Sequence, residues 1–364
     1  MPELFRSPLA DFHSSRGAVL GEYRGSLVPE RFTDTASEHR STRQAVGLSD
    51  FSFRSRFIMR GADRARFLQR IISNDVKNLV AGQGTYATLL TPQGHIVADF
   101  RIYCTEDAFL FDVDADIREK TINGLKRYVI ADKVTVEPTP IGALSVQGPR
   151  AREALEGALG RELPPLPQYG HAATEFTGTA VRVIHASSTG EDGFEIWTEP
   201  AGLQGLWTAF MERAGATGLV PCGAAALESL RIEAGIPRYG ADFGEDTLPL
   251  EAGLLNALSF NKGCYIGQEI VERARSRGHV NWKLVGLVIE SPTPPVSGEK
   301  LLADAKEVGE ITSACVSPTL SKMIALAYVR REFSEVGSRL ILANGGPAEV
   351  VPLPFYRARE GFCG

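Results

Sequence analysis

Hydrophobic positions alternate or recur with helical spacing along most of the first 235 residues. Alternation predicts strands at 53–61, 108–116 and 143–147, and a strand pair at 84–104 joined by a Pro-Gln-Gly turn. A further strand, turn and strand are predicted over 179–199. Helical spacing predicts helices over 35–52, 62–76, 117–130, 149–159, 201–215 and 223–235. This mixture of strands and helices predicts an α+β fold for the main body.

The hydrophobic pattern changes character after Trp282. Short apolar runs at 283–290, 308–316, 322–329 and 339–344 are separated by Gly/Pro turns and lack helical spacing. They predict a compact all-β barrel or sandwich at the C-terminus. We therefore expect an N-terminal extension at 1–34, an α+β body of two interleaved subdomains at 35–280, and a β-barrel domain at 281–364.

The net charge and the cysteine content indicate which partners and which cellular compartment to expect. The net charge of -5 gives no general attraction to nucleic acid or anionic membranes, so we expect no direct nucleic-acid binding and no membrane partner. The five cysteines are widely spaced and odd in number, which suits a reducing compartment better than a disulfide framework. Because no apolar run is long enough for a signal peptide or a membrane span, we expect a cytoplasmic protein.

One cysteine lies in an unusual setting. Cys264 follows the pair Lys262-Gly263 and precedes a predicted helix beginning near Gln268. Helix N-terminal N–H groups and the Lys262 charge both favour a reactive thiolate. The alternative is a small buried residue in a tight turn. We expect no metal site, because this spacing does not assemble four ligands.

The helix after Cys264 is basic. Arg273 and Arg277 are four residues apart and share a helix face. They form either a solvated surface or a site for an anion such as phosphate, polyglutamate or an RNA backbone.

Two sets of segments resemble known families. The segments "KGCYIGQE" at 262–269 and "RARSRG" at 273–278 resemble the motif of YgfZ-type folate-binding proteins. Longer segments resemble their wider superfamily, the glycine-cleavage T-proteins, or aminomethyltransferases: "GLSDFS", "FLQRIISNDV", "LLTPQGHIVADFRIY", "VQGPRA", "TGEDGFEI", "GLVPCGAAALESLRIEAG" and "GEITSACVSPTL". The resemblance implies a three-domain cloverleaf with a central site for tetrahydrofolate or a one-carbon or polyglutamylated derivative.

The resemblance also implies roles for individual residues. Glu233 and Asp99 match segments that contact the pterin ring, whose N–H groups a buried carboxylate can accept. The alternatives are a glutamate on a helix surface and an aspartate at a strand end. The remaining residues that the resemblance implies at the folate site are Tyr265, Gln268, Glu269 and Arg273, with Cys264 and Lys262 as the catalytic pair.

Three positions depart from the T-protein pattern. Ala98 replaces the first acid of an Asp-Asp pair, Ser188 replaces a tyrosine, and Gln268 replaces an arginine. Together with the cysteine motif they favour a YgfZ-type role over methylene transfer from an aminomethyl-lipoyl carrier. That role would be support of iron–sulfur cluster assembly or repair in client enzymes, including tRNA-modifying ones, with Cys264 essential and with iron–sulfur carrier or client proteins as partners. An aminomethyltransferase or related demethylating domain is the alternative, and a folate-independent scaffold is a third possibility.

Overall fold

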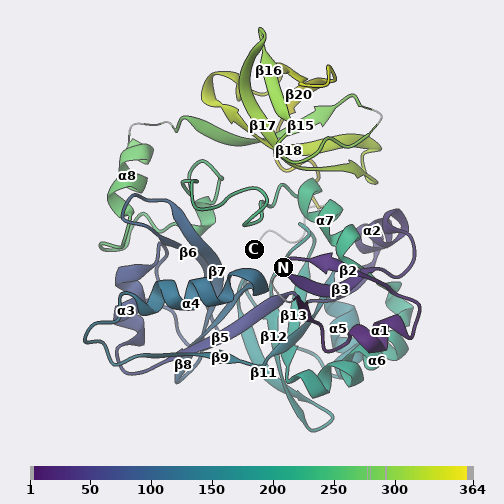
Figure 1. Cartoon of the computed structure of the whole chain (residues 1–364). Coiled ribbons are helices and arrows are strands. Elements are labelled where there is room, and N and C mark those ends of the chain that lie inside the picture. The colour runs from purple at the N-terminus through teal and green to yellow at the C-terminus, as the bar shows by residue number, and fades with distance from the viewer. Residues whose placement is uncertain (1–3, 277, 279, 292, 359–364) are drawn as a thin grey trace.

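The computed structural model describes residues 4–276, 278, 280–291 and 293–358, which form three lobes. A β-barrel lies at the top of Figure 1, and two sheet-containing lobes lie side by side below it. This arrangement confirms the α+β class, the three-part cloverleaf and the C-terminal barrel, which is closed.

One lower lobe is built on a five-stranded antiparallel sheet with the order β6-β7-β8-β5-β9. Its helices are α3 (Arg64–Ile71) and α4 (Arg118–Lys126). Phenylalanine and aliphatic side chains from the sheet and helices fill its core. The strands are β5 (Arg54–Arg60), β6 (Gly84–Leu90), β7 (Ile96–Cys104), β8 (Ala108–Asp114) and β9 (Thr135–Thr139).

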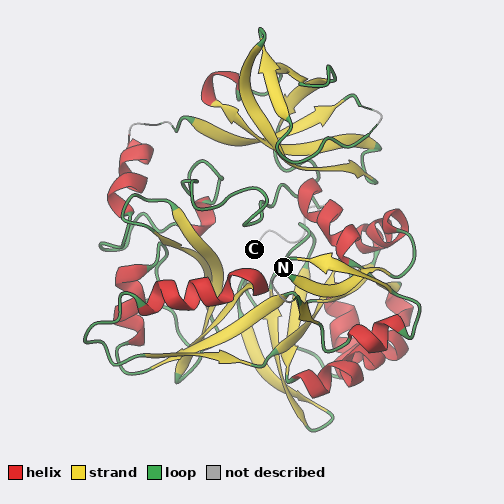
Figure 2. Ribbon diagram, in the orientation of Figure 1, coloured by secondary structure: helices red, strands yellow, loops and turns green. Residues whose placement is uncertain are grey.

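The other lower lobe is built on a six-stranded sheet with the order β11-β12-β13-β10-β4-β14, and α5 and α6 pack into its core. Figure 2 shows the two sheets meeting at the centre of the molecule. The elements are β4 (Val46–Asp50), β10 (Gly142–Gln147), α5 (Ala151–Leu159), β11 (His171–Phe176), β12 (Thr179–His185), β13 (Gly193–Thr198), α6 (Leu203–Arg213) and β14 (Leu219–Pro221). Because β4 precedes the five-stranded sheet in sequence, the two lobes are interleaved along the chain.

The predicted helix over 35–52 is only partly correct. Helix α2 (Thr35–Gln44) begins after Asp34, whose side chain accepts the Ser37 N–H at 2.8 Å. The chain then enters strand β4, in which all five residues are buried. Only Ala45 separates the helix from the strand, so no glycine or proline marks the boundary in the sequence.

The N-terminal residues, which carry little pattern, form a small sheet with the order β1-β3-β2. Its elements are β1 (Phe5–Arg6), α1 (Ala10–Ser14), β2 (Val19–Tyr23) and β3 (Ser26–Arg31). Helix α7 (Ala224–Glu233) packs against β3 and α2, and also contacts barrel strands β17 and β18. The N-terminal sheet and α7 therefore connect the lobes around the centre of the molecule.

The barrel closes in the order β15-β18-β17-β16-β19-β20 around an aliphatic interior. Helix α8 (Gln268–Ser276) precedes it, at the left of Figure 1. The strands are β15 (Trp282–Ile289), β16 (Lys300–Ala303), β17 (Lys306–Ser317), β18 (Lys322–Arg330), β19 (Arg339–Leu342) and β20 (Pro347–Val351).

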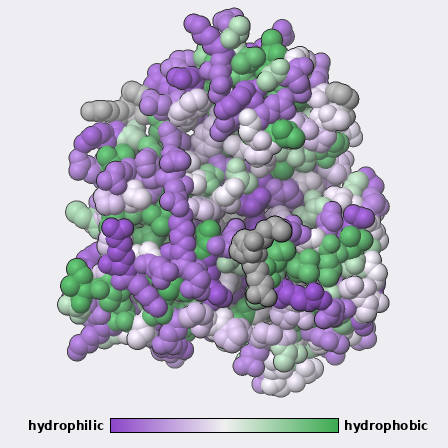
Figure 3. Space-filling model, in the orientation of Figure 1, coloured by the Kyte–Doolittle hydropathy of each residue, from purple (hydrophilic) through white to green (hydrophobic). Residues whose placement is uncertain are grey.

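The surface of the viewed face mixes hydrophilic and hydrophobic residues over all three lobes (Figure 3). None of the helices formed by the described residues has the length and apolar character needed to cross a membrane.

Candidate functional site

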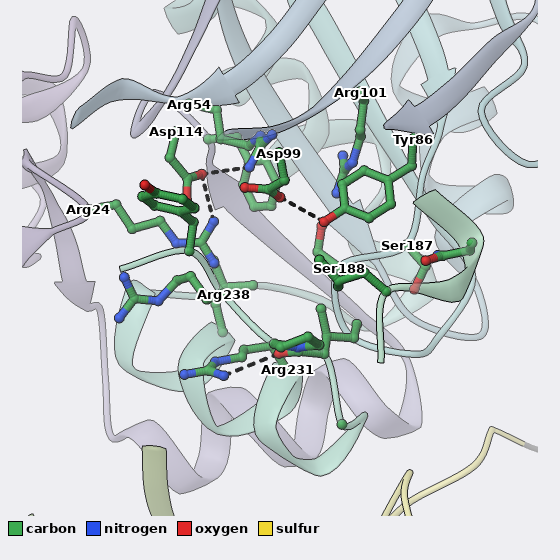
Figure 4. A pocket seen from close by; sticks show the side chains of 18 of the residues that line it. Arg24, Arg54, Tyr86, Asp99, Arg101, Asp114, Ser187, Ser188, Arg231 and Arg238 are labelled. Carbon is green, nitrogen blue, oxygen red and sulfur yellow. Dashed lines mark hydrogen bonds and ion pairs between the residues drawn. The ribbon is translucent and has the colours of Figure 1, made fainter. Parts of the chain in front are cut away.

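A central cavity of about 510 Å³ lies where the two lower lobes meet the β2–β3 hairpin and the chain after α7 (Figure 4). This volume falls in the range of small-molecule sites. Aromatic and aliphatic side chains form part of the wall. The polar side chains that line it are Tyr23, Arg24, Arg54, Tyr86, Asp99, Arg101, Asp114, Gln168, Tyr169, Ser187, Ser188, Arg231, Arg238, Tyr239 and Asn256.

Side chains alternate between the two faces of strand β7, and this alternation directs Asp99 into the cavity. Successive strand residues point to opposite faces of the sheet. Ala98 and Phe100 are fully buried in the lobe core, whereas Asp99 and Arg101 line the cavity. The side chain at position 98 therefore faces away from the cavity, and the loss of an acid there removes no carboxylate from its wall.

Asp99 is hydrogen-bonded to the neighbouring strand. The Tyr86 hydroxyl on β6 donates to Asp99 Oδ2 at 2.8 Å, and the two residues are diagonal neighbours because Tyr86 pairs with Arg101. Among the described residues, Asp99 forms no ion pair, unlike Asp114, the other carboxylate in the wall. Asp99 is thus the lining carboxylate that is available for chemistry.

The pKa of Asp99 is raised to about 6. Burial is the main cause, the negative charge of Asp114 adds to it, and the Tyr86 hydrogen bond opposes both. A carboxyl group with a pKa near 6 exchanges protons readily at neutral pH, as a general acid or base must.

Five arginines and two aspartates line the cavity, so arginine is the most frequent charged residue of its wall. Arg54 donates to Asp112 and to Asp114, both at 2.6 Å, and Arg24 donates to Asp114 at 2.9 Å. Arg101 is bound to Glu195. Arg231 is held by Asp242 and Glu228. Four of the arginines are therefore fixed by buried or partly buried acids.

Arg238 is held less tightly. Its ion pair is a 3.8 Å contact between Nε and Glu228 Oε2, and that carboxylate also accepts from Arg231 and Tyr23. Figure 4 shows Arg238 beside Arg24 among the lining side chains. Of the five cations, Arg238 is the best placed to meet an anionic ligand.

The β2–β3 hairpin contributes two residues that sequence reasoning missed, Tyr23 and Arg24. Its loop, Arg24-Gly25, has positive φ at both positions (52° and 70°), as a type I′ turn requires. The Tyr23 hydroxyl donates to Glu228 at 2.9 Å and Arg24 to Asp114, which ties the hairpin to α7 and β8. The turn residue Gly25 was the available signal, but nothing in the sequence located the turn at the cavity.

Glu233 does not line the central cavity. It is fully buried, and its carboxylate accepts from Ser317 and Thr319 of the barrel segment and from His39 and Arg43 on α2. Burial alone would raise its pKa, but the hydrogen bond and charge of His39, with the other donors, lower it to about 2. Glu233 thus connects α7, α2 and the barrel.

The motif around Cys264 also lies outside the cavity lining. The Lys262 ammonium donates to the carbonyls of Ile72 at 2.7 Å and Asn74 at 2.8 Å, and burial lowers its pKa to about 8. Cys264 is exposed, four residues before α8. Lys262 therefore anchors the segment to the α3–β6 connection.

The other motif residues are dispersed. Tyr265 is buried in the core of the five-stranded lobe, and burial raises its pKa to about 12. Gln268 begins α8 and is half-buried. Glu269 and Arg273 form an exposed i,i+4 ion pair at 2.6 Å on that helix. None of them lines the central cavity, while Arg277 and Cys363 lie outside the described residues.

The cavity contains no arrangement for a metal. Across the described part of the chain, no group of three or more His, Cys, Asp or Glu side chains is placed to hold a metal ion.

Comparisons with known proteins match nearly the whole chain. Residues 9–262 match the GCVT N-terminal domain, and residues 283–357 match the glycine cleavage T-protein C-terminal barrel domain. A relative from Rubrobacter xylanophilus named "Aminomethyltransferase" is 35% identical over 361 residues, covering 98% of this chain and 95% of its own. One of the same name from Rippkaea orientalis is 34% identical, covering 100% of both chains.

A solved structure agrees with these relatives. The glycine cleavage system aminomethyltransferase T from Bartonella henselae has a TM-score of 0.89 and 26% identity, covering 98% of this chain and 99% of its own.

These matches correct the main functional expectation from the sequence. The prediction of a YgfZ-type role in iron–sulfur cluster assembly, with iron–sulfur carrier or client proteins as partners, is wrong, because the full-length relatives are named aminomethyltransferases. That prediction gave most weight to a short segment, which the structure places outside the central cavity. The matches across both domains show that the chain belongs to the glycine cleavage T-protein family.

Proposed function

We propose that this protein is a folate-dependent aminomethyltransferase and that the central cavity is its active site. The observation that carries the proposal is Asp99, a carboxyl group with a pKa of about 6 and no ion pair among the described residues, in the wall of an arginine-lined cavity. The names of the full-length relatives support the reaction class.

The size of the cavity and its arginine side chains support tetrahydrofolate as the ligand. Its volume of about 510 Å³ lies within the range of sites for ligands of this size. Folate is a ring system with a glutamate tail, so its carboxylates are attracted to the arginines. The aromatic side chains of Phe51, Phe53 and Tyr169 offer flat apolar surfaces for the rings. Arg238, the least compensated cation, is our candidate for the tail carboxylate.

Aminomethyl transfer to tetrahydrofolate requires proton movement. Two new bonds join the transferred carbon to folate nitrogens, and two bonds break, one to the amine and one to the carrier sulfur. The two protons lost by the folate nitrogens end on the released ammonia and on the carrier thiol. A group that accepts a proton and returns it near neutral pH accelerates such a step by about 100- to 10,000-fold.

Asp99 has the properties this role requires. As a carboxylate it accepts the proton of the attacking folate nitrogen, and as the acid it returns that proton to a leaving group. Tyr86 holds the carboxyl group in place through its hydroxyl. Arg54 and Arg24 neutralise Asp114, so that the second acid stays ionised.

Two of the three departures from the T-protein pattern lie outside the cavity wall. Ala98 faces the lobe core, and Gln268 lies on α8. Ser188 does line the cavity, and its hydroxyl has no partner among the described residues. Ala98 and Gln268, the departures that removed an acid and a cation, therefore leave Asp99 and the lining arginines unaffected.

The proposal is tested by a product assay with an aminomethylated lipoyl carrier protein. Methylenetetrahydrofolate and ammonia should form in equal amounts, and only when both carrier and tetrahydrofolate are present. Binding of tetrahydrofolate without either product, over a range of carriers, would overturn the transfer reaction while leaving the folate site standing.

A further inference from the structure

A second cavity of about 380 Å³ lies next to the central one, on the other side of Arg54. It is formed by β1, the β4–β5 connection, the start of α4, the β9–β10 connection and Pro200. These segments come from the N-terminal sheet and both lower lobes, so the fold, and not one loop, shapes the cavity.

The charged side chains that line this second cavity are all positive. Arg6, Arg54 and Arg118 line it, and none of the described lining residues is an aspartate or glutamate. Arg6 pairs with Asp11 and Arg118 with Glu119, but these acids are 90% and 64% exposed. Exposed pairs of this kind are weak and exchange easily for another anion.

Not every polar side chain of the wall is available to a ligand. Ser52 lines the cavity, but its hydroxyl is buried and a molecule in the cavity does not reach it. Arg54, whose side chain is 10% exposed, is held by Asp112 and Asp114. Arg6 and Arg118 are therefore the cations that a ligand can meet.

The remaining wall is apolar. Phe5, Ile141 and four prolines, including Pro138 and Pro140, line it. A ligand that satisfied both parts of the wall would carry an anionic group on an apolar body. Inorganic phosphate would satisfy only the arginines, and a purely apolar molecule would leave them unused.

We propose that this second cavity binds a small organic acid with an apolar body, its carboxylate held by Arg118. The site is separate from the proposed folate site, and its test requires no folate and no turnover.

Calorimetric titration with hexanoate, hexylamine and inorganic phosphate tests the proposal. Hexanoate should bind saturably, and hexylamine should not. Phosphate should bind at least tenfold more weakly than hexanoate, because it leaves the apolar wall uncovered. Equal binding of hexanoate and hexylamine would overturn the proposal, since it would show apolar adsorption only.

Three amino-acid variants test which cavity binds hexanoate. Arg118→Gln should weaken hexanoate at least tenfold, whereas Arg238→Gln, the matched change in the central cavity, should leave it within twofold. Pro140→Glu, at an exposed position in the wall, should also weaken it by adding a negative charge. Loss of binding in Arg238→Gln alone would place hexanoate in the central cavity and refute the second site. If Arg118→Gln does not fold, unchanged hexanoate affinity in Pro140→Glu would refute it equally.

Discussion

Tyr86 Oη lies 2.8 Å from Asp99 Oδ2, across the diagonal between two adjacent antiparallel strands. A hydroxyl donor stabilises the carboxylate form, so this bond lowers the pKa of Asp99 while burial raises it to about 6. Burial and the nearby acid also raise the pKa of Tyr86 itself, so it remains a proton donor at neutral pH.

Changing Tyr86 to phenylalanine should therefore move the pH profile in a predictable direction. The phenylalanine removes the donor, so the pKa of Asp99 rises above about 6, and the pH below which kcat/KM falls should rise with it. Rates measured between pH 5 and 9 for wild type and variant test this. If the pH profile of kcat/KM is the same in the variant as in wild type, Tyr86 does not act on the titrating group.

Arg238 should contribute to folate affinity. Replacing Arg238 by glutamine removes the least compensated cation of the wall, and a hydrogen bond to a charged group contributes about 1.5–3 kcal/mol, or about ten- to 150-fold in Kd. Tetrahydrofolate titrations measure the change. Arg150→Gln is the matched control, because Arg150 pairs with Glu153 on the surface and should leave the Kd unchanged. Equal Kd values for all three proteins would exclude Arg238 from the site.

Glu233 should matter for stability more than for ligand binding. Glu233→Gln breaks a buried network that holds α7, α2 and the barrel together, which should cost about 3–5 kcal/mol of unfolding free energy. Glu245→Gln breaks an exposed pair with Lys120 and should cost less than about 1 kcal/mol. Urea unfolding of wild type and both variants measures the two losses of unfolding free energy.

The same network has a pH signature. The pKa of Glu233 is about 2 in the folded protein and about 4.5 when the chain is unfolded. Its contribution is complete above the unfolded value and is lost as the pH falls towards 2. The stability gap between wild type and Glu233→Gln should therefore narrow as the pH is lowered from 5 towards 3. A gap that stays constant would show that the charge of Glu233 is not what stabilises the fold.

Cys264 should be alkylated before the other described cysteines. It is exposed, whereas burial raises the pKa of Cys222 and of Cys315 to about 12 and also raises that of Cys104. Iodoacetamide labelling followed by mass spectrometry gives the site-specific rates. Tetrahydrofolate should not slow the labelling of Cys264, since this residue does not line the central cavity. Strong protection by folate would place the thiol at the folate site after all.

The sequence predicted most of the strands and helices of the main body from the spacing of their apolar residues. Alternation identified β5 and β8, and the Pro-Gln-Gly turn identified the β6–β7 pair. Prediction failed at β4, a short strand that only one residue separates from α2 and that the helix predicted over 35–52 wrongly included. It also left the N-terminal residues unassigned, because the small β1-β3-β2 sheet is too short to show a period.

The site was harder to predict, because a cavity is made by residues distant in sequence. Asp99 was identified through its segment, and the structure places it in the wall. Arg24 and Arg238 reach the same cavity from a hairpin and a loop, a placement that only the tertiary fold determines. Conversely, "KGCYIGQE" is contiguous and conspicuous, yet its residues are divided between a surface turn, the lobe core and α8.

The most direct test of the account is the turnover of wild type and Asp99→Asn with an aminomethylated lipoyl carrier and tetrahydrofolate. Asparagine preserves the shape of the side chain but neither gives nor takes the proton. We predict wild-type turnover on the order of one per second or faster, with kcat/KM falling below a pH of about 6. For Asp99→Asn we predict a rate about 100- to 10,000-fold lower, with tetrahydrofolate affinity within about threefold of wild type. A variant that turns over within about tenfold of wild type, or a wild type that binds folate and transfers nothing, would contradict the account.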